Sequence, residues 1–301
     1  MYSDVLTAVI RSAMQPQSRF QQHCDAQDFI DKGYGSGEKF NWNIYSNVAT
    51  QGGRLTETAR MPETGFTITQ GTGTVFEFGN SVPYSKILDD LSEQPVKQII
   101  HKALKNDANK AFEVESRAQF RLTPLAVEAA SGTSTTAITI TTNSLAASVN
   151  NVAMNTTHVK LISDQMKERN IPVYSDGNYR CIGRPSTFRS VKDTLETVSS
   201  YTSEGFRQIL NGEVGRSYEG IRFFEQTTVA SRAFSNAKTD EAYFFGEDTV
   251  IEAVVCPPEI RGKLPSDYGR DKGVAWYALE GFALVHTVAA QARIMVWTSA
   301  S

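Results

Sequence analysis

The chain has 301 residues and a mass of 33.2 kDa, enough for one large domain or two ordinary ones. Hydrophobic residues make up 40% of it, so it can build a core with little to spare. Its 30 Lys and Arg against 33 Asp and Glu leave a net charge of −3, which lacks the basic excess of a sequence-reading DNA-binding protein.

The first part of the chain predicts an arm followed by a ribbon. Residues up to about 45 are polar and Gln- and Gly-rich, without a long amphipathic period. From 47 to 82, alternating stretches such as 66–69 (FTIT) and 74–78 (TVFEF) are punctuated by glycines, as at 71–73 (GTG). This pattern describes a long exposed hairpin without a core of its own. Because a two-stranded ribbon is only marginally stable alone, it must lie on something else.

A long amphipathic helix is the clearest element of the sequence. Ser85 is a suitable N-cap for a short helix through Leu91, and Pro95 suits the first position of the next helix. From there, apolar residues recur at spacings of three and four, while four lysines and Glu113 occupy the other face. The apolar positions are Val96, Ile99, Ile100, Ala103, Leu104, Ala108, Ala111 and Phe112. The pattern predicts a helix of about 24 residues, roughly 36 Å long.

The remaining chain mixes strands and helices without strict alternation. A helix is expected over 157–169, stopped by Asn170 and Pro172, and another from Pro185 to about Leu195. Asp176-Gly177 is a hairpin-turn signal. The predicted strands are 136–142, 179–182, 220–225, 249–255, 274–277 and 281–297. This order favours an α+β fold over a doubly wound sheet.

No grouping of residues indicates a catalytic, cofactor or metal site. The three cysteines and four histidines lie singly in the sequence, without Cys-x-x-Cys or His-Glu-x-x-His spacing. The glycine runs lack the third glycine of a dinucleotide-binding loop, and Asp89-Asp90 is explained by helix-dipole preference. The start of the chain has no basic region, and no run approaches about 18 apolar residues. We therefore expect a soluble intracellular protein that is not an enzyme and has no cofactor.

Several segments, in order, resemble one family of proteins. They are Phe78–Ser85 (FGNSVPYS), Asn155–Pro185, Gly212–Gly215 (GEVG), Gly220–Glu225 (GIRFFE) and Asp271–Tyr277 (DKGVAWY). Together with the order of arm, hairpin and long helix, they resemble the major capsid proteins of tailed bacteriophages, which have the HK97-like coat fold. The local motifs are most similar to the capsid family of the enquatrovirus-type podoviruses. The likeness covers about residues 60–300 and leaves the arm unaligned.

The resemblance implies a division of the chain into five parts. These are an N-terminal arm (1–46), an extended loop hairpin (47–83), a peripheral domain with the spine helix (84–145), an axial domain (146–249) and a return to the peripheral domain (250–301). It also implies self-assembly into pentamers and hexamers of an icosahedral shell, in the virion capsid, around double-stranded DNA that is bound non-specifically. Portal, scaffolding and decoration proteins are the further partners to expect, and no membrane is involved.

The hairpin is where the chain would meet its copies. A closed shell needs heterologous contacts between subunits, and these contacts bury surface that is exposed to solvent in a monomer. The buried interface is expected to total about 2,000 Å² or more. If the hairpin lies over a neighbour, its apolar residues form that interface. They are Phe66, Ile68, Val75, Phe76 and Phe78. The alternative is a hairpin that folds back on its own chain.

Two other functions remain open at this stage. An encapsulin-like nanocompartment shell uses the same fold and encloses protein, although the Gly212–Glu225 segment favours a phage. A soluble α+β enzyme with an unrecognised site belongs to a different class. The kind of cargo separates the two shells, and particle formation separates both from the enzyme.

Overall fold

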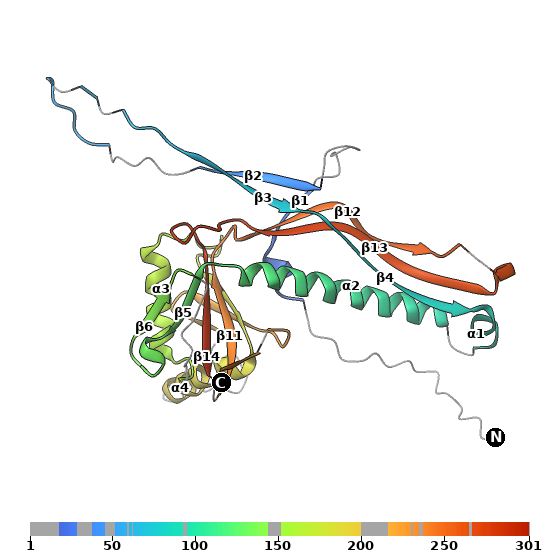
Figure 1. Ribbon diagram of the computed structural model, residues 1–301. Coiled ribbons are helices and arrows are strands. Elements are labelled where there is room, and N and C mark those ends of the chain that lie inside the picture. Colours follow the sequence, from blue (N-terminus) through green and yellow to red (C-terminus); the bar gives the residue numbers. More distant parts are fainter. Residues whose placement is uncertain are drawn as a thin grey trace.

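The computed structural model shows an α+β chain with three visible parts: a mixed sheet-and-helix body, an elongated sheet lying along one long helix, and a projecting ribbon (Figure 1). It describes residues 18–28, 38–45, 52–58, 60–61, 63–92, 95–143, 152–199, 216–229, 231–234, 237–264 and 267–300. Most of the expected N-terminal arm and the Gly212–Gly215 segment lie outside these ranges.

The body is built on an eight-stranded sheet in the order β6-β5-β14-β11-β7-β9-β8, with β10 paired to β11. Its strands are β5 (Leu125–Ala129), β6 (Ile138–Thr141), β7 (Tyr179–Gly183), β8 (Ser217–Tyr218), β9 (Ile221–Glu225), β10 (Ser231–Phe234), β11 (Ala237–Phe245) and β14 (Ile294–Ala300). Two pairs, β5 with β14 and β7 with β9, are parallel, and the others are antiparallel. This mixture confirms the α+β prediction.

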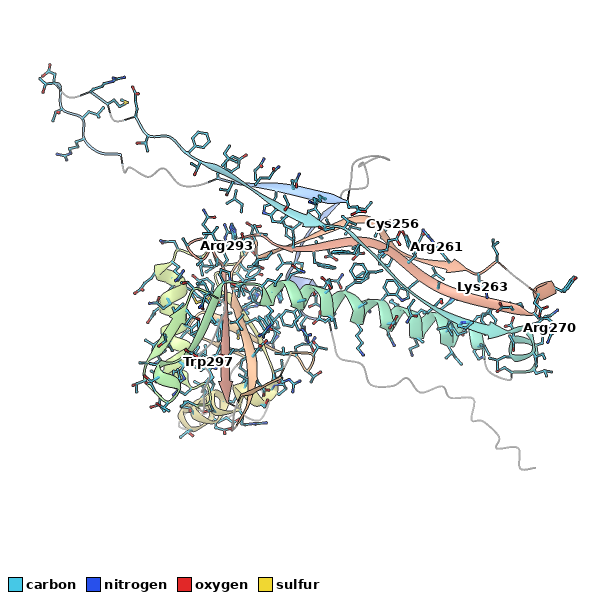
Figure 2. The ribbon with its side chains drawn as sticks, viewed as in Figure 1. Cys256, Arg261, Lys263, Arg270, Arg293 and Trp297 are labelled. Atoms are coloured by element: carbon cyan, nitrogen blue, oxygen red, sulfur yellow. The ribbon has the colours of Figure 1, made fainter. Side chains whose placement is uncertain are left out.

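Two helices complete the body near the positions that the sequence predicts. α3 (Thr156–Glu168) begins at Asn155, whose side chain accepts a hydrogen bond from the His158 N–H, and Asn170 just beyond its end has a φ of 56°. α4 spans Pro185–Ser199. Side chains from both helices pack with sheet residues such as Trp297, which is fully buried (Figure 2).

The elongated part is a four-stranded sheet in the order β1-β12-β13-β4 with one helix along it. The strands are β1 (Asp25–Asp28), β12 (Val250–Gly262), β13 (Asp271–Leu284) and β4 (Phe76–Ser85), and the helix is α2 (Val96–Arg121). Residues 100, 104, 108 and 112 of α2 are buried against even-numbered residues of β13. The long-helix prediction is therefore confirmed, at 26 residues. α1 (Lys86–Leu91), capped by Ser85, and the 3₁₀ turn η3 (Asp267–Gly269) form the far tip.

The ribbon is paired differently from the sequence prediction. β3 (Ile68–Thr74) pairs with β2 (Lys39–Tyr45), a segment that we assigned to the arm, while Phe76–Ser85 pairs with β13. Stretches 66–69 and 74–78 therefore follow one another along the chain and do not face each other. The physical reason is that each gains a longer partner: β2 offers seven paired residues and β13 ten.

Two smaller predictions also differ from the structure. The expected strand over 281–297 is two strands, because β13 ends at Leu284 and β14 starts at Ile294. The Asp176-Gly177 turn forms, with Gly177 at a φ of 74°, but the strand after it pairs with β11 and β9 rather than with the segment before the turn. Short 3₁₀ turns, η1 (Gln21–His23) and η2 (Ala130–Gly132), complete the described elements.

Candidate assembly surfaces

The root of the ribbon is fixed to its own chain by two aromatic residues of β2. Phe40 is 1% exposed and packs in a small core with β12 and β13 residues such as Ile251 and Ala283. The Trp42 indole N–H donates to the Val285 carbonyl at 3.3 Å. At its root the ribbon thus has no separate core but shares one with the elongated sheet, so that this part lies on its own chain rather than on a neighbour.

Glycines on β3 make this close packing possible. A Cβ added to Gly73 would lie 2.2 Å from the Phe40 ring, and one added to Gly71 would lie 2.2 Å from the Trp42 ring. Real Cβ atoms do not approach other atoms this closely, so any side chain here would displace the rings. We interpreted the glycines of the 71–73 sequence as breaks between strands. Instead, they leave the space in which the Phe40 and Trp42 rings pack against β3.

Beyond its root, the ribbon extends away from the rest of the molecule (Figure 1). Its large apolar side chains there are exposed, with Phe66 at 63% and Ile68 at 53%. The others are Tyr45, Leu55 and Met61. Scattered single apolar residues are ordinary on protein surfaces, but a run of them on one projection indicates a contact surface.

The structure separates the five predicted contact residues into two groups. Phe66, Ile68 and Phe76 are exposed and free to meet another molecule. Val75 and Phe78 are partly buried against their own chain, and the Phe78 ring lies edge-on to that of Phe112 with centroids 5.6 Å apart. Only the first three therefore offer most of their side chain to a partner.

The far tip of the elongated part is a second exposed apolar surface. Ile87 and Leu91 of α1 are exposed, as are Leu264 and Tyr268 near η3. Between these two elements is an open cavity of about 410 Å³. Its lining residues are Pro83, Tyr84, Ser85, Lys86, Ile87, Asp267, Arg270 and Asp271.

An ion-pair cluster holds this tip together. Asp89 of α1 contacts Lys272 of β13 at 2.9 Å and Lys97 of α2 at 3.4 Å. The hydrogen bond from Lys272, followed by that from Lys97, lowers the pKa of the Asp89 carboxyl against the opposing effect of desolvation. Asp89 therefore has a structural role here, and joins one helix to two other elements.

The buried carboxylate of Glu113 holds the first described residues of the chain, from Ser18, against α2. Glu113 of α2 is 2% exposed, although we assigned it to the solvent face. It accepts hydrogen bonds from the Ser18 hydroxyl at 2.9 Å, from the backbone N–H groups of residues 19–21 and from the Gln226 amide at 2.7 Å. These bonds satisfy the carboxylate and seat the fully buried Phe20 against the body.

Two further carboxyls are buried where η1, β12 and β13 meet. Glu252 accepts a hydrogen bond from the Gln21 amide at 2.9 Å, and burial raises its pKa. Burial, with a smaller contribution from the negative charge of Glu252, raises the pKa of Glu280 to about 7. Burial also raises the pKa of the nearby Cys24 thiol, so that this cysteine stays protonated and unreactive.

The histidines occupy separate structural positions. His158 belongs to the N-terminal capping box of α3, and its ring packs on Trp297 with centroids 4.9 Å apart. His286 is buried with its Nε2 3.8 Å from an Asp248 oxygen, although neither ring nitrogen has a hydrogen-bond partner. In the described ranges, no three His, Cys, Asp or Glu side chains are grouped as metal ligands would be. No helix there is both long and apolar enough to cross a membrane.

No protein-family model matches the chain, and no curated protein matches it in sequence. Solved structures match along its whole length. The capsid of cyanophage P-SCSP1u superimposes with a TM-score of 0.71 at 10% identity, covering 100% of this chain and 94% of the phage chain. The capsids of cyanophage Pam1 and of Ralstonia phage GP4 both give 0.66, at 13% and 12% identity, with 99% of this chain covered and 96% and 95% of theirs.

These structures share the overall fold of this chain across nearly their full length, although only 10% to 13% of residues are identical. The narrower likeness to the enquatrovirus-type podovirus capsids stays a prediction. At the level of architecture the result is clear: the chain has the HK97-like fold of tailed-phage capsid proteins.

Proposed function

We propose that this protein is the major capsid protein of a tailed bacteriophage, which assembles into pentamers and hexamers of an icosahedral shell around double-stranded DNA in the virion. The observation that carries the proposal is the ribbon, whose root is packed on its own chain while its outer apolar residues are exposed. Because its root is already fixed on its own chain, the ribbon loses less conformational freedom when it contacts a neighbouring copy. The capsid structures that share the fold support this reading.

The contact on a neighbour is proposed to involve Phe66, Ile68 and Phe76. A ribbon that reaches from one copy onto a different surface of the next makes a heterologous contact, and such contacts close into rings when the rotation allows it. The exposed apolar tip formed by α1 and η3 offers a second surface for contacts between copies. Both surfaces lie outside the body core, so assembly can proceed without refolding it.

The domain division is proposed in a modified form. The peripheral domain includes α2, β4 and the long strands β12 and β13, and the axial domain is the body that contains α3 and α4. The ribbon starts at Lys39, within the arm range of 1–46, because β2 is one of its two strands. A portal protein, with scaffolding or decoration proteins, would complete the particle.

Electron microscopy of the purified protein tests this function. The expected result is closed particles or capsomers, together with an ultraviolet spectrum that shows nucleic acid in filled particles. Particles that contain protein cargo instead would favour the nanocompartment shell. A stable 33.2 kDa monomer with no particles at any concentration would contradict both shells and favour a soluble enzyme.

A further inference from the structure

The solvent face of α2 carries positive charge without compensating acids. Lys102, Lys105 and Lys110 are exposed, and no acidic side chain in the described part of the chain pairs with them. The one acid between residues 96 and 112 is Asp107. It is turned toward the sheet, where it accepts hydrogen bonds from the Trp276 indole at 3.0 Å and the Asn80 amide at 2.9 Å. We call these three lysines the lysine face.

On the opposite side of the elongated part, along the sheet and at its tip, the basic side chains are paired with acidic ones. Figure 2 shows Arg261 and Lys263 on or beside β12 and Arg270 at the tip. Each has an acidic partner: Arg261–Glu259, Lys263–Asp271 and Arg270–Asp267. The unpaired positive charge of this part of the molecule is therefore on the helix side, at α2, and not on the strand side.

The geometry of the lysine face fits a polyphosphate. From Lys102 to Lys110 the helix rises about 12 Å, and the three side chains lie within about 140° of its circumference. Duplex DNA presents about seven phosphates over that length. The polar residues beside the lysines are Gln98, Asn106 and Asn109, whose amides can also donate to phosphate oxygens. The face carries no aromatic anchor of the kind that protein interfaces favour.

We propose that the lysine face contacts the phosphate backbone of the enclosed double-stranded DNA, and that α2 therefore lines the inner surface of the shell. This inference rests on the proposed capsid function. Three lysines give a weak contact that depends on salt, because each phosphate neutralised releases condensed counterions. A weak and sequence-independent contact suits DNA that is packed and later released.

Binding of the full-length, unassembled protein to a fluorescein-labelled 30-base-pair duplex tests the proposal, with anisotropy measured between 50 and 200 mM NaCl. If three phosphates are neutralised, wild-type affinity falls about 40-fold over this range. The Lys102→Gln/Lys105→Gln variant should lose only about 3- to 4-fold, because the slope of log affinity against log salt falls by about two. The matched control is Lys160→Gln/Lys167→Gln on the exposed face of α3, which should behave as wild type.

Equal salt slopes for the wild type and the Lys102→Gln/Lys105→Gln variant would overturn the proposal, as would an equal loss in the α3 control. A wild-type protein that does not bind the duplex would also overturn it, and would point to an acidic protein as the occupant of this face. Electron microscopy of the same samples keeps the two hypotheses apart. Particles from every variant would leave the capsid function intact whatever the binding result, whereas absence of particles from the wild type would contradict the function itself.

Discussion

Glu280 is a buried carboxyl whose ionisation should affect the stability of the fold. It is 2% exposed on β13, its Oε2 atom has no hydrogen-bond partner, and its pKa is raised to about 7. A carboxyl with a raised pKa binds more protons in the folded than in the unfolded chain between its two pKa values. The free energy of unfolding should therefore fall as the pH rises from about 4.5 to about 7, and then level off.

The Glu280→Gln variant should remove this dependence. We expect it to be about 1 to 3 kcal/mol more stable than the wild type at pH 8, and close to the wild type at pH 4.5 to 5. Urea unfolding of the unassembled protein at both pH values measures the difference. Glu57→Gln on the exposed ribbon is the matched control and should change neither value. A Glu280→Gln variant less stable than the wild type at pH 8 would show that the ionised carboxylate is instead accommodated.

Among the elements, the ribbon depends on the glycines that lie under its aromatic rings. Gly73→Ala would place a methyl group 2.2 Å from the Phe40 ring, which would have to leave its core position. Overpacking of this kind costs about 1 to 3 kcal/mol. Because β2 and β3 form a separate two-stranded unit, the loss should appear as local opening of the ribbon. Hydrogen exchange of the β2 and β3 amides should accelerate about 5- to 150-fold, while α3 stays protected.

The control for this change is another glycine of the ribbon. Gly53 has open space around the position of an added Cβ, so Gly53→Ala should leave exchange in β2 and β3 unchanged. Equal acceleration in both variants would mean that the loss of a glycine anywhere in the ribbon speeds exchange, and that the packing of Phe40 on Gly73 does not determine the stability of the ribbon.

Elements with a strong local signal could be predicted from the sequence, and pairings over long separations could not. α2 and α3 have periodic apolar faces and end signals, and both form near the expected bounds. The partner of β3 does carry a local strand signal, because Phe40, Trp42 and Ile44 alternate with polar residues in 39–45 (KFNWNIY), but this alternation does not indicate which strand it pairs with. Nothing local distinguishes that partner from any other short strand, since strand pairing is decided by packing between distant segments.

The misplacement of Glu113 has a geometric cause that the sequence does contain. Buried positions on α2 recur every four residues, from Ile100 through Phe112 to Ser116 and Phe120. A spacing of four exceeds the 3.6 residues of one turn, so the buried stripe drifts around the helix by about 40° per step. By the second half it reaches the side that carries Glu113. A fixed face extrapolated from the first turns therefore fails after about four turns.

At the scale of the whole molecule, the fold distinguishes residues that stabilise the subunit from residues available for assembly. Phe78 packs on Phe112 of its own chain, whereas Phe66 is 63% exposed on the projecting ribbon. Substitution of the first should damage folding, and substitution of the second should damage only contacts between copies. The two positions thus form a matched pair, with the same residue type in different surroundings.

We expect Phe66→Asp to leave the stability of the unassembled subunit within about 0.5 kcal/mol of the wild type, because a surface change away from packed groups has little effect. Particle formation should nevertheless be lost, since a carboxylate would be buried against a neighbour at each of many equivalent contacts. Phe66→Leu, which keeps an apolar side chain, should still assemble, while Phe78→Asp should lower subunit stability by about 3 kcal/mol or more. Urea unfolding and particle yield by electron microscopy measure the two effects. Normal particle yield from Phe66→Asp would exclude this residue from the interface and leave Ile68 and Phe76 as the contacts to test.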